Sequence, residues 1–286
     1  MLIKERNEPI NLKIMTALNT RMSLSKEHQR YYHNLKSGYE GECLFDQYVK
    51  EYVPLSCAVL NDLQLKIYTT DFQIDTLIIH DQTISIYEIK NYQTDITYHH
   101  NNFITKSGTI ITNPLGQLNR TETALRNWLK LNRLTYDVEA YVCFINPEAM
   151  IYGAPYHPNI IYACQLSRHL KNLNPHTSKA EQLMKTLMEN HIADFRSGKD
   201  LPDYQKETIK KGVACRYCHS FETKIKDRTT YCLTCGQTES TQETMNRQIA
   251  EFQVLFPEEL LDTAVLHDWC KKQVSKQRLY RQLAKV

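Results

Sequence analysis

The segment 73–90, which reads QIDTLIIHDQTISIYEIK, constrains the fold more than any other part of the chain. Two β-branched, largely apolar stretches lie on either side of Asp81-Gln82, and this pattern predicts two buried strands joined by a tight hairpin turn. Because side chains alternate along a strand, a turn at this point fixes which residues face each other. The predicted pairs are Ile79 with Ile84, Leu77 with Ile86, and Asp75 with Glu88.

This register places two carboxylates opposite each other on one face of the hairpin. Lys90 shares the face with Glu88, because residues two apart in a strand point the same way. Paired carboxylates repel unless one is protonated or a cation lies between them, and oxygen ligands of this kind suit Mg²⁺ or Mn²⁺. The alternative is a pair of exposed strand ends, with a solvated Asp75 and a simple Glu88–Lys90 ion pair.

The composition describes a soluble globular protein of 286 residues, 42% of them hydrophobic. No apolar run approaches the roughly 20 residues of a membrane span, and the N-terminus lacks the apolar core of a signal peptide. We therefore expect a cytoplasmic protein. A net charge of +3 does not by itself indicate a nucleic-acid partner, although the basic residues are concentrated toward the C-terminus.

The chain divides by pattern into five segments. The apolar pattern predicts a helix over 26–52 and strands over 57–111. It then predicts a helix from Asn113-Pro114 to Asn132, followed by further strands and helices up to residue 192. The polar stretch that follows, with Gly198 and Pro202, is typical of a linker. The expected segments are an N-terminal arm (1–25), a catalytic-type domain (26–195), a linker (196–212), a cysteine-rich segment (213–238) and a basic helical segment (241–286).

Four motifs in the first half of the chain carry a family resemblance. They are Gly41-Glu42 on the first long helix, Gln73-Ile74-Asp75 on one strand, Glu88-Ile89-Lys90 on the next, and Asn113-Pro114-Leu-Gly-Gln117 at the start of a second helix. In this order they resemble the nuclease-related domain (NERD) family of the PD-(D/E)xK nuclease-like superfamily. The resemblance covers about residues 36–150. One departure is Ile74, which stands where the superfamily usually has proline.

The resemblance implies an α/β fold of the restriction-endonuclease type, a mixed sheet flanked by helices. It also implies Asp75 and Glu88 as metal ligands, Lys90 as the catalytic lysine, and Glu42 and Gln117 as residues that complete the site. Without the family, Glu42 is equally well an ordinary exposed helix acid. Gln117, in a first helical turn, is equally well a capping or solvated residue.

These residues suit phosphodiester hydrolysis. The reaction needs a nucleophile made from water near neutral pH and neutralisation of the charge that develops on the phosphate. Asp75 and Glu88 would bind Mg²⁺ or Mn²⁺, with the Ile89 carbonyl as a further ligand, and Glu42 would bind a metal-bound water or a second ion. Lys90 would orient or deprotonate the attacking water, and Gln117 would donate a hydrogen bond to that water or to the phosphate.

Four cysteines form a separate motif, a pair of CxxC sequences. Cys215 and Cys218 are followed after thirteen residues by Cys232 and Cys235. This spacing matches a four-cysteine zinc ribbon, in which all four positions around Zn²⁺ are occupied by thiolates and the metal is structural. The alternative is four free or redox-active thiols.

The C-terminal segment ends in a helix that is basic on its solvent side. Leu279 and Leu283 form its apolar face, and the turn before it makes a helix-turn-helix possible. Solvated basic faces are common, which is the alternative to DNA binding. The candidate phosphate contacts are Lys271, Lys272, Lys276, Arg278, Arg281 and Lys285.

Taken together, the motifs predict a metal-dependent deoxyribonuclease whose zinc ribbon and basic helices position nucleic acid. Two other classes remain open. A nuclease-like fold without activity could bind nucleic acid or act as a regulator, and a scaffold could use the ribbon and helices to bind protein.

Overall fold

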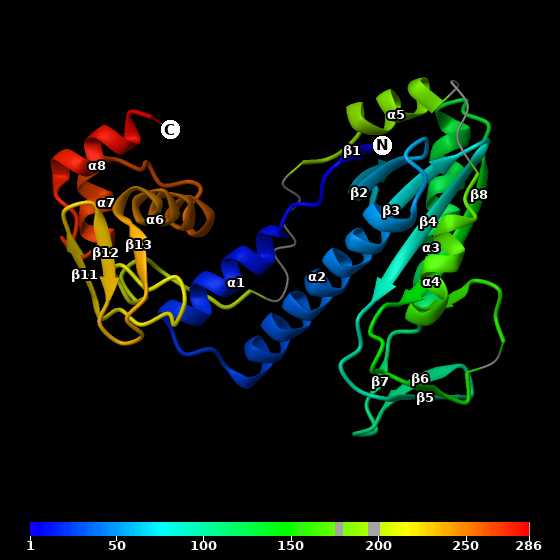
Figure 1. Cartoon of the computed structure of the whole chain (residues 1–286), viewed down its shortest axis with the longest axis horizontal. Helices are drawn as coiled ribbons and strands as arrows, with labels where there is room; N and C mark the ends of the chain where they lie inside the picture. Colours follow the sequence, from blue (N-terminus) through cyan, green and yellow to red (C-terminus); the bar gives the residue numbers. More distant parts are fainter. Residues whose placement is uncertain (155, 175–179, 194–200, 286) are drawn as a thin grey trace. The chain divides into compact units, whose positions relative to one another are not determined.

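A computed structural model describes residues 1–154, 156–174, 180–193 and 201–285. The chain forms two compact units (Figure 1). The first consists of Met1–Glu8 and Asn34–Phe195, and the second of Pro9–His33 and Arg196–Val286. The long helix α2 (Lys26–Tyr52) begins in the second unit and continues into the first.

A six-stranded mixed sheet is the centre of the first unit. Its order is β1-β2-β3-β4-β8-β10. The β2–β3 and β3–β4 pairs are antiparallel, whereas β1–β2, β4–β8 and β8–β10 are parallel. The bounds are β1 Leu2–Lys4, β2 Ala58–Ile67, β3 Thr70–His80, β4 Thr83–Lys90, β8 Asp137–Phe144 and β10 Ile160–Tyr162.

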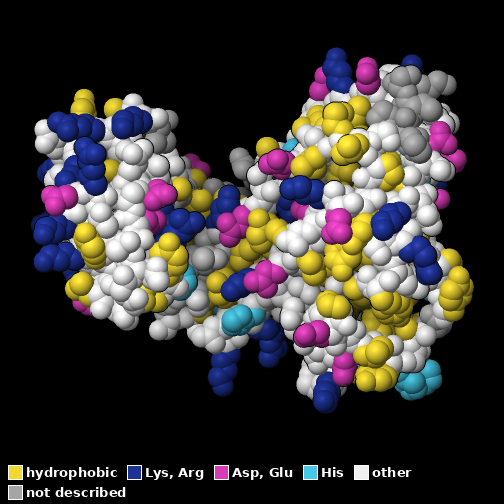
Figure 2. All heavy atoms as spheres, viewed as in Figure 1, with side chains coloured by type: hydrophobic (Ala, Val, Ile, Leu, Met, Phe, Trp, Pro, Cys, Tyr) yellow, Lys and Arg dark blue, Asp and Glu magenta, His cyan; other side chains and the backbone are white. Residues whose placement is uncertain are grey.

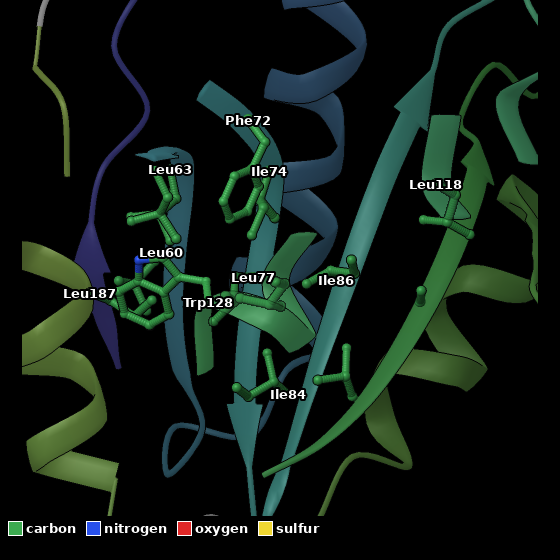
Figure 3. Close-up of a cluster of buried hydrophobic side chains, with 14 of the residues drawn as sticks. Leu60, Leu63, Phe72, Ile74, Leu77, Ile84, Ile86, Leu118, Trp128 and Leu187 are labelled. Carbon is green, nitrogen blue, oxygen red and sulfur yellow. The ribbon is translucent and has the colours of Figure 1, made fainter. Parts of the chain in front are cut away.

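Helices cover both faces of this sheet. Apolar side chains of α3 (Pro114–Leu131) and α5 (Ala180–Glu189) pack on one face, where Figure 3 shows Trp128 and Leu187 close to Leu60. Side chains of α2 and α4 (Ala163–Lys171) pack on the other face, through Phe45 and Leu166 among others. The expected α/β fold, a mixed sheet flanked by helices, is confirmed.

The hairpin of β3 and β4 has the register expected from the sequence. Leu77 pairs with Ile86 and Ile79 with Ile84, around a two-residue turn in which Asp81 has a φ of 47°. The ladder ends at the pair Thr76–Tyr87. The next facing positions, Asp75 and Glu88, therefore lie where the two strands stop pairing.

Side-chain alternation also breaks at this end of the sheet. Leu60 and Leu63 of β2, three residues apart, belong to the same core, and so do Ile74 and Leu77 of β3. A regular strand would point such residues to opposite faces. The break falls at Asp62, which has a φ of 50°, and at its facing residue Asp75.

A small sheet follows the hairpin, in the order β7-β6-β5-β9. The sequence predicts a single hairpin from 96 to 111 turned at Ser107-Gly108; the structure adds a tighter turn at His100-Asn101, where both residues have positive φ. The bounds are β5 Ile96–His99, β6 Asn102–Thr105, β7 Ile110–Ile111 and β9 Ile151–Tyr152.

The second unit combines an N-terminal helix with the C-terminal third of the chain. It contains a three-stranded antiparallel sheet in the order β11-β12-β13. The bounds are α1 Ile10–Arg21, β11 Thr223–Lys226, β12 Thr229–Cys232, β13 Thr238–Ser240, α6 Thr241–Leu255, α7 Thr263–Trp269 and α8 Lys276–Leu283.

The buried side chain of Arg21 joins these parts of the second unit. It forms an ion pair with Glu251 of α6, donates to the Lys210 and Gly212 carbonyls, and lies 3.8 Å over the Trp269 ring. Residues 1–25, expected as a peripheral arm, thus divide between the two units. Part of the expected linker, 196–200, lies outside the described residues, while Ile209 is buried in the second unit.

Helix α2 approaches the end of β4 very closely at Gly41. A β-carbon at this position would overlap the β-carbon of Asn91. One turn earlier the two elements exchange hydrogen bonds, from Asn91 Nδ2 to the Ser37 carbonyl (2.8 Å) and from Ser37 Oγ to the Asn91 carbonyl (3.1 Å). Glycine at 41 therefore sets the distance between the helix that carries Glu42 and the strand that carries Glu88.

We predict that Gly41→Ala lowers the free energy of unfolding by about 2 kcal/mol, because the added methyl group must displace Asn91. Gly38→Ala is the matched control, since no atom lies within 4 Å of a β-carbon at this position of the same helix. It should be neutral or raise stability by about 0.5–1 kcal/mol. Urea denaturation of both variants measures the difference, and equal effects would contradict the close approach.

Candidate active site

The candidate site begins with Asp75 at the end of the hairpin ladder. Its Oδ2 accepts a hydrogen bond from the Ile89 backbone N–H at 2.8 Å. The β3–β4 ladder has ended before Ile89, so this N–H group is not bonded to the β3 backbone. The bond to Ile89 holds Asp75 against β4 next to Glu88, which is 5% exposed. The two acids expected to face each other are thus at the same end of the hairpin.

Lys90 connects Glu88 to helix α3. Its ammonium group donates to Glu88 Oε1 at 2.7 Å and to Gln117 Oε1 at 3.0 Å. Helix α3 starts with Pro114 after Asn113, whose side chain accepts from the Leu115 N–H at 3.0 Å, and this start places Gln117 in the first turn. The structure therefore brings together Glu88, Lys90 and Gln117 from two elements.

Glu42 lies in the same region but is bound to a residue that the sequence motifs do not contain. Arg6, whose side chain is 2% exposed, donates from Nη1 to Glu42 Oε2 at 2.8 Å. It also donates to both carboxylate oxygens of Asp46, at 2.9 and 3.0 Å, and to the Asp75 carbonyl at 2.9 Å. Arg6 thus links the helix and strand that carry two of the candidate acids.

Sequence reasoning missed Arg6 and Asp46. Asp46 could have been found, because it follows Glu42 by four residues and lies on the same helix face. Arg6 gives no comparable indication: it stands in a short polar segment after β1, far from every motif. Only the parallel pairing of β1 with β2 brings this segment to the site.

Burial makes the acids of this site unusually basic. It raises the pKa of Glu42 to about 8 and that of Glu88 to about 7, and in both cases the negative charge of Asp75 adds to the effect. Burial also raises the pKa of Asp75, although Lys90, the Ile89 N–H and Arg6 act in the opposite direction. Bringing these carboxylates together is therefore costly without a further cation.

The donor set fits a hard divalent cation. Oδ1 of Asp75 and Oε2 of Glu88 accept no hydrogen bond from the described residues, so each acid keeps one free oxygen. Carboxylate oxygens beside a backbone carbonyl are ligands that Mg²⁺ and Mn²⁺ prefer. Glu42 also has one oxygen held, by Arg6, while its Oε1 accepts no hydrogen bond from the described residues.

The four cysteines of the second unit form a much tighter group. The ligand atoms of Cys215, Cys218, Cys232 and Cys235 all lie within 4.8 Å of one another, and no other group of three or more such ligands in the described ranges is as compact. Two sulfur–sulfur distances are 3.7 and 3.5 Å. A tetrahedral Zn²⁺ with bonds of about 2.3 Å requires sulfurs ~3.8 Å apart.

Backbone groups favour thiolate at Cys232: the N–H groups of Cys235 and Thr234 lower its pKa to about 6. The pKa values of Cys218 and Cys235 are raised, by burial and by hydrogen bonds with neighbouring thiols. The cluster is able to bind zinc through four thiolates, with no position left for a substrate. His219 lies nearby in sequence but is not part of the group, and its Nδ1 is 3.4 Å from Thr20 Oγ1.

The six basic residues expected to contact phosphate are all exposed, either on α8 or next to it. Lysine and arginine side chains gather over α8 and beside β11 in this view (Figure 2). Leu279 is fully buried, so α8 packs by the apolar face that the sequence indicates. Ser275 precedes α8 without a side-chain capping bond.

The first unit is an α/β domain with buried acids next to a lysine at one end of its sheet. The family model NERD, nuclease-related domain, matches residues 37–145. The match includes Glu42, Asp75, Glu88, Lys90 and Gln117 but not Arg6. Comparisons with curated proteins and with solved structures gave no match. Among the helices that the structure describes, none combines the length and apolar character needed to cross a membrane.

The raised pKa of Glu88 predicts a pH-dependent effect on stability. Without divalent cations the folded state binds a proton more tightly than the unfolded state, so this group costs stability as the pH rises from about 4.5 to about 7. The change in the free energy of unfolding caused by Glu88→Gln should therefore be about 2 kcal/mol more stabilising at pH 8 than at pH 5.

The exposed Glu40 of α2 provides the control. Glu40→Gln should give the same small difference at both pH values. Urea denaturation in metal-free buffer at pH 5 and pH 8 measures both variants. A Glu88→Gln effect that does not change with pH would contradict the burial of a charged carboxylate.

For the cysteine cluster, we predict that Cys215→Ser removes the bound metal. The parent chain should carry about one zinc ion per molecule, and the variant much less, because a three-thiolate site binds zinc more weakly. Cys164→Ser, at an exposed cysteine outside the cluster, should retain the metal. Elemental analysis measures the zinc content, and thermal unfolding measures the stability. A parent chain that unfolds at the same temperature with and without zinc would contradict a structural zinc.

Proposed function

We propose that the chain is a Mg²⁺- or Mn²⁺-dependent nuclease that hydrolyses phosphodiester bonds in DNA. The observation that carries the proposal is the hydrogen bonding of Lys90 to both Glu88 and Gln117 beside Asp75. A structural role does not require two buried acids with raised pKa values and a lysine at one point of a sheet. The nuclease-related domain match supports the same conclusion.

Each residue has a separate task in this reaction. Asp75 and Glu88 would hold the metal through their free oxygens, and the bound cation would supply an activated water and neutralise phosphate charge. Lys90 uses two of its three N–H donors on Glu88 and Gln117, which leaves the third for the attacking water or a phosphate oxygen. Gln117 fixes the direction of this ammonium group and has its own amide N–H groups for the substrate.

The second unit would hold the nucleic acid. A four-thiolate zinc would stabilise its small sheet, which is too short to build a core alone. The exposed basic residues on and beside α8 would contact phosphates, and such contacts give binding that weakens with salt. The segment from α7 to α8 has the helix-turn-helix order, with Lys271 and Lys272 in the turn.

A non-catalytic nucleic-acid-binding protein is the second candidate, and one observation favours it. Arg6 already neutralises Glu42 and Asp46, so part of the acidic cluster is balanced by the protein's own cation. In a nuclease, Arg6 would instead position Glu42 next to the metal site. Activity measurements separate the two candidates.

We predict cleavage of plasmid, linear or single-stranded DNA in Mg²⁺ or Mn²⁺ and none in chelator. Asp75→Asn and Lys90→Met should each reduce the cleavage rate ~100-fold or more, because each removes a group that acts on the reacting phosphate or water. Asp71→Asn and Lys66→Met are matched controls on β3 and β2, where these two residues form an exposed pair at 3.9 Å.

The controls should keep the parental rate within about twofold. Cleavage that persists in both site variants would show that the site is elsewhere or that the activity is a contaminant. If no DNA or RNA is cut but DNA is bound in a salt-dependent way, the non-catalytic candidate is correct.

A further inference from the structure

The three-stranded sheet of the cysteine-rich segment packs one face against the rest of the second unit, and its other face, called the open face below, is exposed to solvent. Thr223, Thr230 and Cys232 are buried, and Thr230 Oγ1 accepts from Thr244 of α6 at 2.8 Å. The neighbouring residue on each strand points the other way. Three residues of this open face lie in one row across the sheet, Lys224, Tyr231 and Thr238.

Within the three strands, the charged residues of the open face are all lysines. Its strand residues are Lys224, Lys226, Thr229, Tyr231, Thr238 and Ser240, as the strand pairing shows. The one acid within the described strands of this sheet, Glu239, points to the opposite face, where it forms an ion pair with Arg247 and accepts from Thr244. Three acids flank the described strands: the exposed Glu222 precedes β11, the exposed Asp227 lies in the turn after β11, and Glu243 is hydrogen-bonded to Ser240 in a capping box.

Tyr231 stands in the middle of this charged surface. Its side chain is 41% exposed, and none of the described aromatic rings stacks on it. Two further apolar side chains, Tyr217 and Leu233, are exposed in the two cysteine-containing turns next to the sheet. An exposed ring beside two lysines offers a stacking surface and positive charge at one place.

The geometry points to single-stranded DNA as the ligand of this open face, with a base stacked on Tyr231 and phosphates bound by Lys224 and Lys226. The ligand rests on the proposed nuclease function, but the surface is separate from the acids of the first unit. The six basic residues near α8 are not part of it.

The chemistry favours a single strand over a duplex. An exposed aromatic ring on a flat sheet stacks only on a base that is not already stacked in a helix. The two lysines are two residues apart on β11, so they lie ~7 Å apart on the same side of Tyr231. They therefore bind the backbone of an extended strand, while the ring contacts its bases.

The test measures binding of a fluorescent oligothymidylate by anisotropy. The full zinc-loaded chain carries Asp75→Asn in every arm, so that cleavage does not remove the probe. Adding Tyr231→Ala should weaken binding about 10-fold, since it removes the ring on which a base stacks. Tyr231→Phe keeps the ring and should bind within about twofold, as should Tyr152→Ala at an exposed tyrosine of the first unit.

The lysines have a second, independent readout. Lys224→Ala with Lys226→Ala should reduce the slope of log affinity against log salt by roughly 1.4, because each phosphate contact on a single strand contributes about 0.7. Equal affinities of the Tyr231→Ala and parent chains would overturn the inference, as would an unchanged salt slope. Tighter binding to duplex DNA or to RNA of the same length would also overturn it.

Failure of this inference and failure of the proposed function are distinguishable. DNA cleavage that depends on Asp75, without Tyr231-dependent binding, would leave the nuclease and remove the single-strand surface. Binding that depends on Tyr231, without any cleavage by the parent chain, would retain the surface and remove the nuclease. Zinc content and circular dichroism of each variant show that the second unit is folded.

Discussion

The geometry of the acidic site depends on the buried guanidinium of Arg6. It binds Glu42 and Asp46 of α2 and the carbonyl of Asp75 in β3, and Thr76 Oγ1 accepts from it at 2.9 Å. Acids this close to one another fold together only with a compensating cation. Those acids and their hydrogen bonds in turn hold the pKa of Arg6 above its usual value, against the effect of burial. A guanidinium suits this task because its donors lie in a fixed plane and it keeps its charge.

The N-terminal segment supplies a buried arginine to each unit. Arg6 organises the acidic site, and Arg21, fifteen residues later, joins α1 to α6 and to the Trp269 ring of the second unit. Each is surrounded by carboxylates and carbonyls, which is the condition for burying such a charge. Neither arginine lies in the matched residues 37–145. Both units therefore include parts of the first 21 residues, outside the residues that the family model matches.

The predicted features that agree with the structure are mainly local in sequence. The β3–β4 register follows from the two-residue period and the short turn, and helix α2 has the predicted limits, 26–52. The four cysteines meet because each CxxC aims two sulfurs at one point. The regular alternation assumed from the sequence fails at Asp62 and Asp75, where it breaks in both strands while β2 continues without interruption. The sequence reading also missed α4, whose nine residues follow directly on β10.

The sequence alone determined the β3–β4 hairpin and its register, the long helices α2 and α3 and the cysteine group, because these depend on period, turn chemistry and local spacing. The tertiary structure decided which charges share the site. Arg6 reaches Glu42 across 36 residues and the Asp75 carbonyl across 69. These contacts follow from the parallel addition of β1 to β2 and the close approach of α2 at Gly41. No local pattern encodes such an approach, since it arises only when separate elements pack on one sheet.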